Sequence, residues 1–204
     1  MNVADMELQK RIDDACWIGA EIFNRNKTTG SSANMSFIYK EKIYVTCSGS
    51  CFGRLTDASF SITDMEGNLL EGPQPSKELP IHLMMYKKTK GFVQAVIHVH
   101  SHFATLWSCL PHEDAGNVIP SYTPYLEMKL GKIRLIPYAK PGSEELFSHF
   151  KENLNEGNGY LLAHHGPVVG GTDLRNAFFG LEELEESARI AWELRNVPNV
   201  VRIS

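Results

Sequence analysis

The stretch that decides the fold is FVQAVIHVHS, residues 92–101. Its run of valine and isoleucine predicts a buried β-strand. Side chains two apart on a strand point to the same face, so the imidazoles of His98 and His100 are expected to project together. Two such imidazoles form half of a divalent-metal site, and zinc accepts their nitrogens at about 2.0–2.1 Å. Two unrelated polar residues on a solvated strand face would produce the same pattern.

Three further residues are candidates to complete this site. His164 and His165 lie within YLLAHHGPVVGG (residues 160–171), which predicts a strand running into a glycine turn. Adjacent strand residues face opposite sides, so only one of the two is expected to join the site. His102 is in register with His98 and is the alternative third ligand.

A carboxylate is the remaining candidate for this group. Glu78 follows a Pro-Ser turn where a helix is predicted to begin, with Ser76 as its N-cap. The positive end of a helix dipole favours a negative charge there. Glu78 could therefore act as a fourth ligand or as an acid or base, or simply stabilise its own helix.

Helices at both ends and in the middle of the chain, with strands between them, predict one layered α/β domain spanning residues 1–204. Short strands in close succession favour a mixed or antiparallel sheet over a doubly wound one. A loop that contains Pro120 and Pro124 is expected to lead into the strand at 132–138, and Thr172 is expected to cap the last helix. The predicted helices are 6–25, 79–86, 104–110, 144–154 and one from 172 onward, and the other predicted strands are 36–40, 42–46, 59–63 and 132–138.

The composition of the chain indicates which kinds of partner and which cellular compartment are to be expected. Twenty basic and twenty-four acidic side chains give a net charge of −4 with no basic run, which argues against nucleic acid. The apolar stretches are far too short to span a membrane. The four cysteines show no metal-ligand spacing, so free thiols in a reducing cytoplasm are expected.

An ordered set of motifs is similar to the class II aldolase and adducin-head superfamily over roughly residues 6–196. The set is S-x-x-N-x-S (31–36), S-G (48–49), P-S-K-E (75–78), H-x-H (98–100), H-G (165–166) and E-x-L-E-x-x-A (182–188). Within that superfamily the chain most resembles the 3-oxo-tetronate 4-phosphate decarboxylases. The features that carry this finer resemblance are SGSCFG (48–53), PSKE, NVIPSYTPY (117–125), IPYAKPG (136–142) and HHGPVV (164–169).

The resemblance implies a three-layer α/β/α sandwich with a largely antiparallel sheet, assembled as a homotetramer with sites between subunits. It implies a divalent ion, Zn²⁺ with Mn²⁺ or Co²⁺ as alternatives, held by His98, His100 and His165. Glu78 takes the position of a ligand or acid/base. The phosphorylated substrate is expected at Ser31, Asn34, Ser48, Gly49, Ser76 and Lys77.

Two departures from the family pattern bear on these expectations. Ala33 replaces a common glycine and would be strained if its φ were positive. Lys77 replaces a serine of the aldolases, which adds a cation beside the site or simply a solvated lysine. The chain also has no clear counterpart of the C-terminal tail tyrosine that some aldolases use.

The expected reaction is metal-dependent decarboxylation of a 3-oxo-tetronate 4-phosphate to dihydroxyacetone phosphate and CO2 through an enediolate. The final protonation needs an acid, for which Glu78 is the first candidate and Tyr125 the second. The alternative functions are a class II aldolase, epimerase or dehydratase acting on another sugar phosphate. A non-catalytic adducin-like scaffold is less favoured, because the three histidines and Glu78 are all present.

Overall fold

A computed structural model describes residues 3–203, so the outermost ends of the expected domain lie outside the described residues. Eight strands form one sheet in the order β4-β3-β2-β1-β5-β8-β7-β6. All neighbouring strands are antiparallel except β6 and β7. The largely antiparallel mixed sheet is thus confirmed. The strands are β1 (Asn34–Tyr39), β2 (Lys42–Thr46), β3 (Phe60–Thr63), β4 (Leu69–Glu71), β5 (Ala95–His98), β6 (Arg134–Ile136), β7 (Gly159–Leu162) and β8 (Gly166–Gly171).

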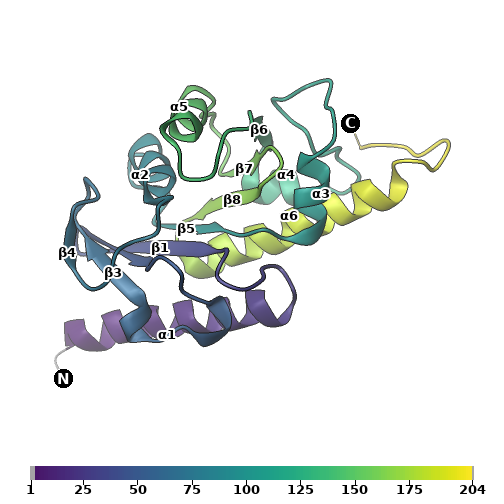
Figure 1. The fold of residues 1–204 in the computed structure, drawn as a ribbon. Coiled ribbons are helices and arrows are strands. Elements are labelled where there is room, and N and C mark those ends of the chain that lie inside the picture. The colour runs from purple at the N-terminus through teal and green to yellow at the C-terminus, as the bar shows by residue number, and fades with distance from the viewer. Residues whose placement is uncertain (1–2, 204) are drawn as a thin grey trace.

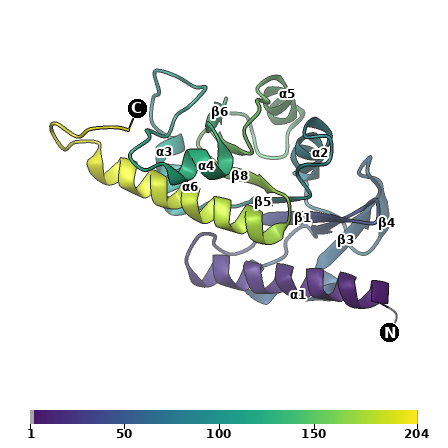
Figure 2. The same cartoon turned by 180° about the vertical axis from the view of Figure 1, so that it is seen from behind.

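Helices cover both faces of the sheet and complete the three expected layers. They are α1 (Val3–Asn24), α2 (Leu79–Lys88), α3 (His102–Ser108), α4 (Tyr125–Leu130), α5 (Glu144–Glu152) and α6 (Leu174–Leu194), with short 3-10 turns at Phe52–Arg54 and Asp57–Ser59. The long helices α1 and α6 lie on one face, and α2 and α5 lie on the other (Figures 1 and 2). In the part of the chain described here, no helix has both the length and the apolar character needed to cross a membrane.

Successive side chains of β5 point to opposite faces of the sheet and enter two different hydrophobic cores. Ile97 packs into the core beneath α1 and α6, whereas Val96 packs into the core beneath α2 and α5. His98 lies on the same face as Val96 because the two are separated by one pleat. This parity directs the His98 imidazole toward α2, where Glu78 stands at the helix start.

The two histidine segments differ locally from the strands expected of them. Strand β5 ends at His98, so His100 lies beyond it. The segment 160–171 is a β7–β8 hairpin rather than one strand, and it turns at His164, whose φ is +55°. At Gly166, with φ +155°, a Cβ would lie 2.3 Å from the Val99 carbonyl oxygen. Glycine is therefore needed for the hairpin to approach the chain between the two histidines.

Two helix caps and one helix also differ from the prediction. Helix α2 has Glu78, not Ser76, as its N-cap, and the Ser76 Oγ accepts a hydrogen bond from Glu78 N (3.3 Å). Helix α6 is capped by Asp173, not Thr172, because the Asp173 carboxylate reaches Asn176 N (2.8 Å). The segment expected as a loop contains a helix that was not predicted, α4 (Tyr125–Leu130).

Candidate active site

Three histidines from distant parts of the chain converge at the end of β5. His98, His100 and His165 each offer a ligand atom, and these atoms all lie within 4.8 Å of one another. His98 and His165 are buried, and His100 is half-buried. The alternatives His102 and His164 are exposed and outside this group; the His164 ring packs edge-on against Tyr138 instead.

The hydrogen bonds of His98 leave one of its ring nitrogens available for a metal ion. Its Nδ1 donates to the Pro167 carbonyl oxygen (2.8 Å), so the lone pair lies on Nε2. That Nε2 is 3.3 Å from His165 Nε2. Two nitrogens bound at about 2.0–2.1 Å to a tetrahedral ion are about 3.4 Å apart, so the observed spacing suits such an ion. His100 Nε2 is buried without a hydrogen-bond partner, which fits the same role.

Burial keeps these imidazoles in the form that binds a cation. Burial, together with the neighbouring His100, lowers the pKa of His98 to about 3. Burial also lowers the pKa of His165, with the nearby His98 adding to the effect. Neutral imidazoles have the lone pairs that a divalent ion requires. The donor set therefore fits a divalent metal ion.

Glu78 brings a carboxylate to this cluster. Its Oε2 lies 3.4 Å from His98 Nε2, and its Oε1 lies 3.7 Å from His165 Nε2. Oε2 also accepts a hydrogen bond from Asn34 Nδ2 (3.0 Å), whereas Oε1 is buried with no hydrogen-bond partner. The free oxygen suits either a contact to a metal ion or a proton exchange with a substrate.

A pocket of about 200 Å³ opens beside the cluster. It brings together every residue expected to bind the substrate, together with residues that the motifs did not single out. Gly142, with φ +72°, is one of these, and it lies against the aliphatic stem of Lys77. The lining residues are Ser31, Ser32, Ala33, Asn34, Cys47, Ser48, Gly49, Ser76, Lys77, Glu78, His100, Pro141, Gly142 and His165.

Two other sequence-based expectations have different outcomes. Ala33 is buried and is not among the residues with positive φ, so the strain considered for it does not arise. Tyr125 is 58% exposed at the start of α4 and does not line the pocket of its own chain. Its role as an acid stays a prediction.

Glu185 is a site-supporting residue that the sequence reasoning did not assign. Its buried carboxylate accepts hydrogen bonds from Ser101 Oγ (2.7 Å), Phe103 N (3.0 Å) and Ala104 N (2.9 Å). It therefore caps α3 from across the α6 interface and fixes the chain directly after His100. The E-x-L-E-x-x-A motif contained this residue but could not indicate its partners.

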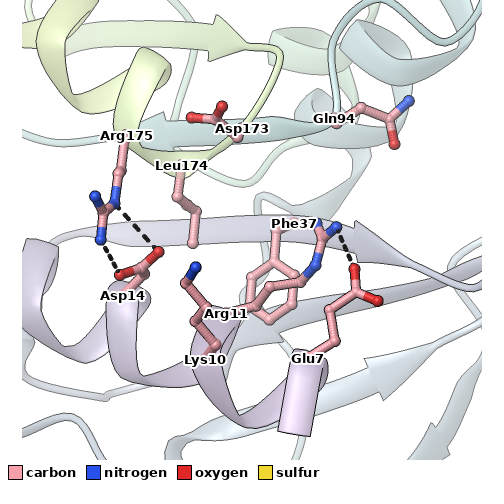
Figure 3. Close-up of a pocket in the computed structure, with 9 residues that line it drawn as sticks. All are labelled: Glu7, Lys10, Arg11, Asp14, Phe37, Gln94, Asp173, Leu174 and Arg175. Atoms are coloured by element: carbon pink, nitrogen blue, oxygen red, sulfur yellow. Dashed lines mark hydrogen bonds and ion pairs between the residues drawn. The ribbon is translucent and has the colours of Figure 1, made fainter. Parts of the chain in front are cut away.

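A second pocket, of about 340 Å³, lies between α1 and the start of α6 (Figure 3). Four of its six charged side chains form ion pairs: Arg175 with Asp14 (2.7 Å) and Arg11 with Glu7 (3.0 Å). Acidic and basic groups balance across it, and none of the clustered histidines lines it. The titratable groups suited to chemistry gather at the histidine pocket instead.

Comparison with known proteins agrees with this geometry. The sequence profile of the Class II Aldolase and Adducin N-terminal domain family matches residues 13–192. The chain belongs to this family. A class II aldolase-family relative from Haemophilus influenzae, named 3-oxo-tetronate 4-phosphate decarboxylase, is 41% identical over 179 residues, covering 87% of this chain and 85% of the relative.

Two other relatives of the family differ in their names. An L-fuculose phosphate aldolase from Methanococcus maripaludis is 32% identical over 176 residues, covering 86% of this chain and 92% of the relative. The crystal structure of YgbL from Escherichia coli superposes with a TM-score of 0.91 at 34% identity. That match covers 96% of this chain and 94% of YgbL.

Proposed function

We propose that this class II aldolase-family protein is a metal-dependent carboxy-lyase that converts a 3-oxo-tetronate 4-phosphate to dihydroxyacetone phosphate and CO2. The observation that carries the proposal is the convergence of three histidines and Glu78 beside a pocket lined with small polar residues. The printed name of the 41% identical relative supports the choice of substrate.

The bond that breaks joins the carboxylate carbon to the hydroxyl-bearing carbon of the substrate. Its electron pair moves toward the adjacent ketone, which gives an enediolate, and protonation of the same carbon completes the product. His98, His100 and His165 would hold a divalent ion, whose positive charge would offset the negative charge that remains on the substrate when CO2 leaves. Glu78 Oε1 is the candidate proton donor, because it is the carboxylate oxygen without a hydrogen-bond partner.

The phosphate group anchors the substrate away from the bond that breaks. Ser31, Ser48, Gly49 and Ser76 line the pocket and suit a phosphate through hydroxyl groups and close backbone approach. Binding energy from this remote group orients the carboxylate out of the plane of the ketone, where the breaking bond overlaps best with the carbonyl. Phosphate binding thereby contributes to the rate as well as to affinity.

Lys77 is assigned to the phosphate rather than to the departing carboxylate. It is the one lysine or arginine among the described residues that line the pocket, and its side chain is exposed. A cation paired with the carboxylate would stabilise the substrate and lose that contact once neutral CO2 forms, which would raise the barrier. A cation on the phosphate keeps its partner throughout the reaction.

The decisive experiment compares CO2 release with aldol cleavage in the purified protein. We expect dihydroxyacetone phosphate and CO2 from 3-oxo-tetronate 4-phosphate, and far slower cleavage of fuculose and ribulose phosphates. His100→Ala should abolish turnover and lower the bound metal. Full turnover in that variant would refute the metal-site proposal, and preferential aldol cleavage would favour the aldolase function that the 32% identical relative suggests.

Four finer features complete the proposal. The resident ion is proposed to be Zn²⁺, which suits an imidazole-rich set, with Mn²⁺ and Co²⁺ distinguished by metal analysis. The protein is proposed to be a cytoplasmic homotetramer with sites between subunits. Light scattering, which measures the mass in solution, tests the oligomeric state. The exposed side chain of Tyr125 would then reach a neighbouring pocket, where it is the second candidate acid. The two cores share one sheet, which supports a single domain.

A further inference from the structure

A chain of buried polar side chains runs from the interior of the molecule to Glu78. Asn34 and Ser36 lie one pleat apart on β1, and Glu78, His82 and Tyr86 recur at a spacing of four along α2. Both spacings place the side chains on one face of their element. The two rows interleave, so each β1 side chain lies between two side chains of α2.

The hydrogen bonds that link these five side chains are short, and the side chains are buried from solvent. Tyr86 OH lies 2.6 Å from Ser36 Oγ, and Ser36 Oγ lies 2.6 Å from His82 Nδ1. His82 Nε2 lies 2.6 Å from Asn34 Oδ1, and Asn34 Nδ2 donates to Glu78 Oε2 at 3.0 Å. Ser36 and His82 are completely buried. These groups have no water with which to replace a lost partner.

The chemistry of each group fixes the direction of every hydrogen bond. Glu78 Oε2 accepts whether the carboxyl group is ionised or carries a proton on Oε1, so Asn34 must present its amino group to it and its carbonyl oxygen to His82. That oxygen can only accept, so the proton of neutral His82 is on Nε2 and its Nδ1 accepts from the Ser36 hydroxyl. Ser36 Oγ then accepts from Tyr86 OH. All four hydrogen bonds therefore donate in the same direction, from Tyr86 toward Glu78.

We propose that His82 is a positioning residue which, by locking the Asn34 amide, holds the Glu78 carboxylate beside the metal-site histidines, with Oε2 hydrogen-bonded to Asn34 and Oε1 left without a hydrogen-bond partner. The proposal rests on the proposed function only in that Glu78 takes part in the reaction. Asn34 uses Oδ1 for His82 and one amino hydrogen for Glu78, and it also lines the pocket, so its expected contact with the substrate stays a prediction. The two carboxylate oxygens thereby take on different tasks.

A matched pair of amide variants tests this proposal. In His82→Gln the side chain is long enough to donate to Asn34, whereas in His82→Asn it reaches Ser36 but not Asn34. We expect kcat to fall about 10- to 100-fold in H82N, the scale of a small misplacement of a reacting group, with KM changed less than about 3-fold. H82Q should recover most of kcat. Met85→Leu, a buried change on α2 outside the polar chain, is the control and should leave kcat unchanged.

A double-mutant cycle separates positioning from general damage to the fold. If His82 acts through Glu78, H82N should change the residual kcat of Glu78→Gln less than about 3-fold. Equal fold-losses in the wild-type and E78Q backgrounds, or a wild-type kcat in folded H82N, would overturn the proposal. Equal losses in H82N and H82Q would overturn it as well.

A crystal structure of the metal-free H82N protein gives a readout that needs no activity. We expect the Asn34 amide to rotate and the contact between Asn34 Nδ2 and Glu78 Oε2 to be lost, whereas H82Q keeps it. An unchanged Glu78 carboxylate in H82N would refute the proposal even if the decarboxylase assignment held. If the protein instead performs aldol cleavage, the same kinetic comparison applies to that reaction, so failure of the two proposals is distinguishable.

Discussion

The burial of His82 predicts a specific loss of stability at mildly acidic pH. Burial, aided by the nearby His98, lowers the pKa of His82 from about 6.5 to about 3. The unfolded chain therefore takes up a proton near pH 6.5, while the folded protein does not until near pH 3. The stability is fully present above about pH 6.5 and is lost progressively as the pH falls toward 3.

The size of this effect follows from the separation of the two pKa values. Each pH unit between them costs about 1.4 kcal/mol, so a fall from pH 7 to pH 5 costs about 2 kcal/mol from His82 alone. For a chain of this length, that corresponds to a fall in Tm of about 4–8 °C. His82→Gln removes the titrating group, so between pH 7 and pH 5 its free energy of unfolding should fall by about 2 kcal/mol less than that of the wild type.

Urea unfolding followed by circular dichroism at pH 7, 6 and 5 measures this difference. Wild type and H82Q are compared without metal at equal protein concentration, because His98 and His165 also titrate in both proteins and cancel in the comparison. H82Q is expected to be less stable at pH 7, since it packs less well, but flatter in its pH dependence. Parallel pH dependences in the two proteins would refute the assignment of His82 as a buried neutral imidazole.

Three further predictions concern the supports of the site. Glu185→Ala should lower the free energy of unfolding by about 2–3 kcal/mol, because it leaves the donors at the start of α3 unpaired; urea unfolding at pH 7 measures this, and a loss below about 0.5 kcal/mol would contradict the capping role. Gly166→Ala should lower Tm and the metal content, because its Cβ would clash with the Val99 carbonyl, whereas Gly30→Ala, in open space with φ +56°, should cost only about 1 kcal/mol. Lys77→Ser should raise KM for the phosphorylated substrate more than it lowers kcat in steady-state assays; an unchanged KM would remove Lys77 from the phosphate site.

The sequence alone predicts the parts of this molecule that depend on local periodicity. Strand β5 and helices α1 and α6 follow from their apolar patterns, and the early succession of short strands correctly indicates an antiparallel sheet. The choice of His165 over His164 came from family resemblance, because strand parity has no meaning for residues in a turn. The structure shows why: His164 has a left-handed backbone at the hairpin.

Long-range pairing accounts for what the sequence did not predict. The spacing of Glu78, His82 and Tyr86 places them on one helix face, but no pattern indicates that β1 supplies their partners. The partners of Glu185 are likewise set by the packing of α6 against α3, some eighty positions apart in the chain. The cap positions differ from the predicted ones by one or two residues: at α6 the Asp173 carboxylate reaches Asn176 N, whereas at α2 the N-cap Glu78 makes no side-chain capping bond.

The hairpin that carries His165 bears on how the protein acquires its ion. His98 and His165 meet only after β5 has paired with β8, and Glu78 joins them only after α2 has docked on the sheet. None of these contacts is local in sequence, so a partly folded chain does not yet have the three histidine nitrogens close together. The three nitrogens can therefore hold an ion only in the folded chain, so binding of the ion would also stabilise the fold.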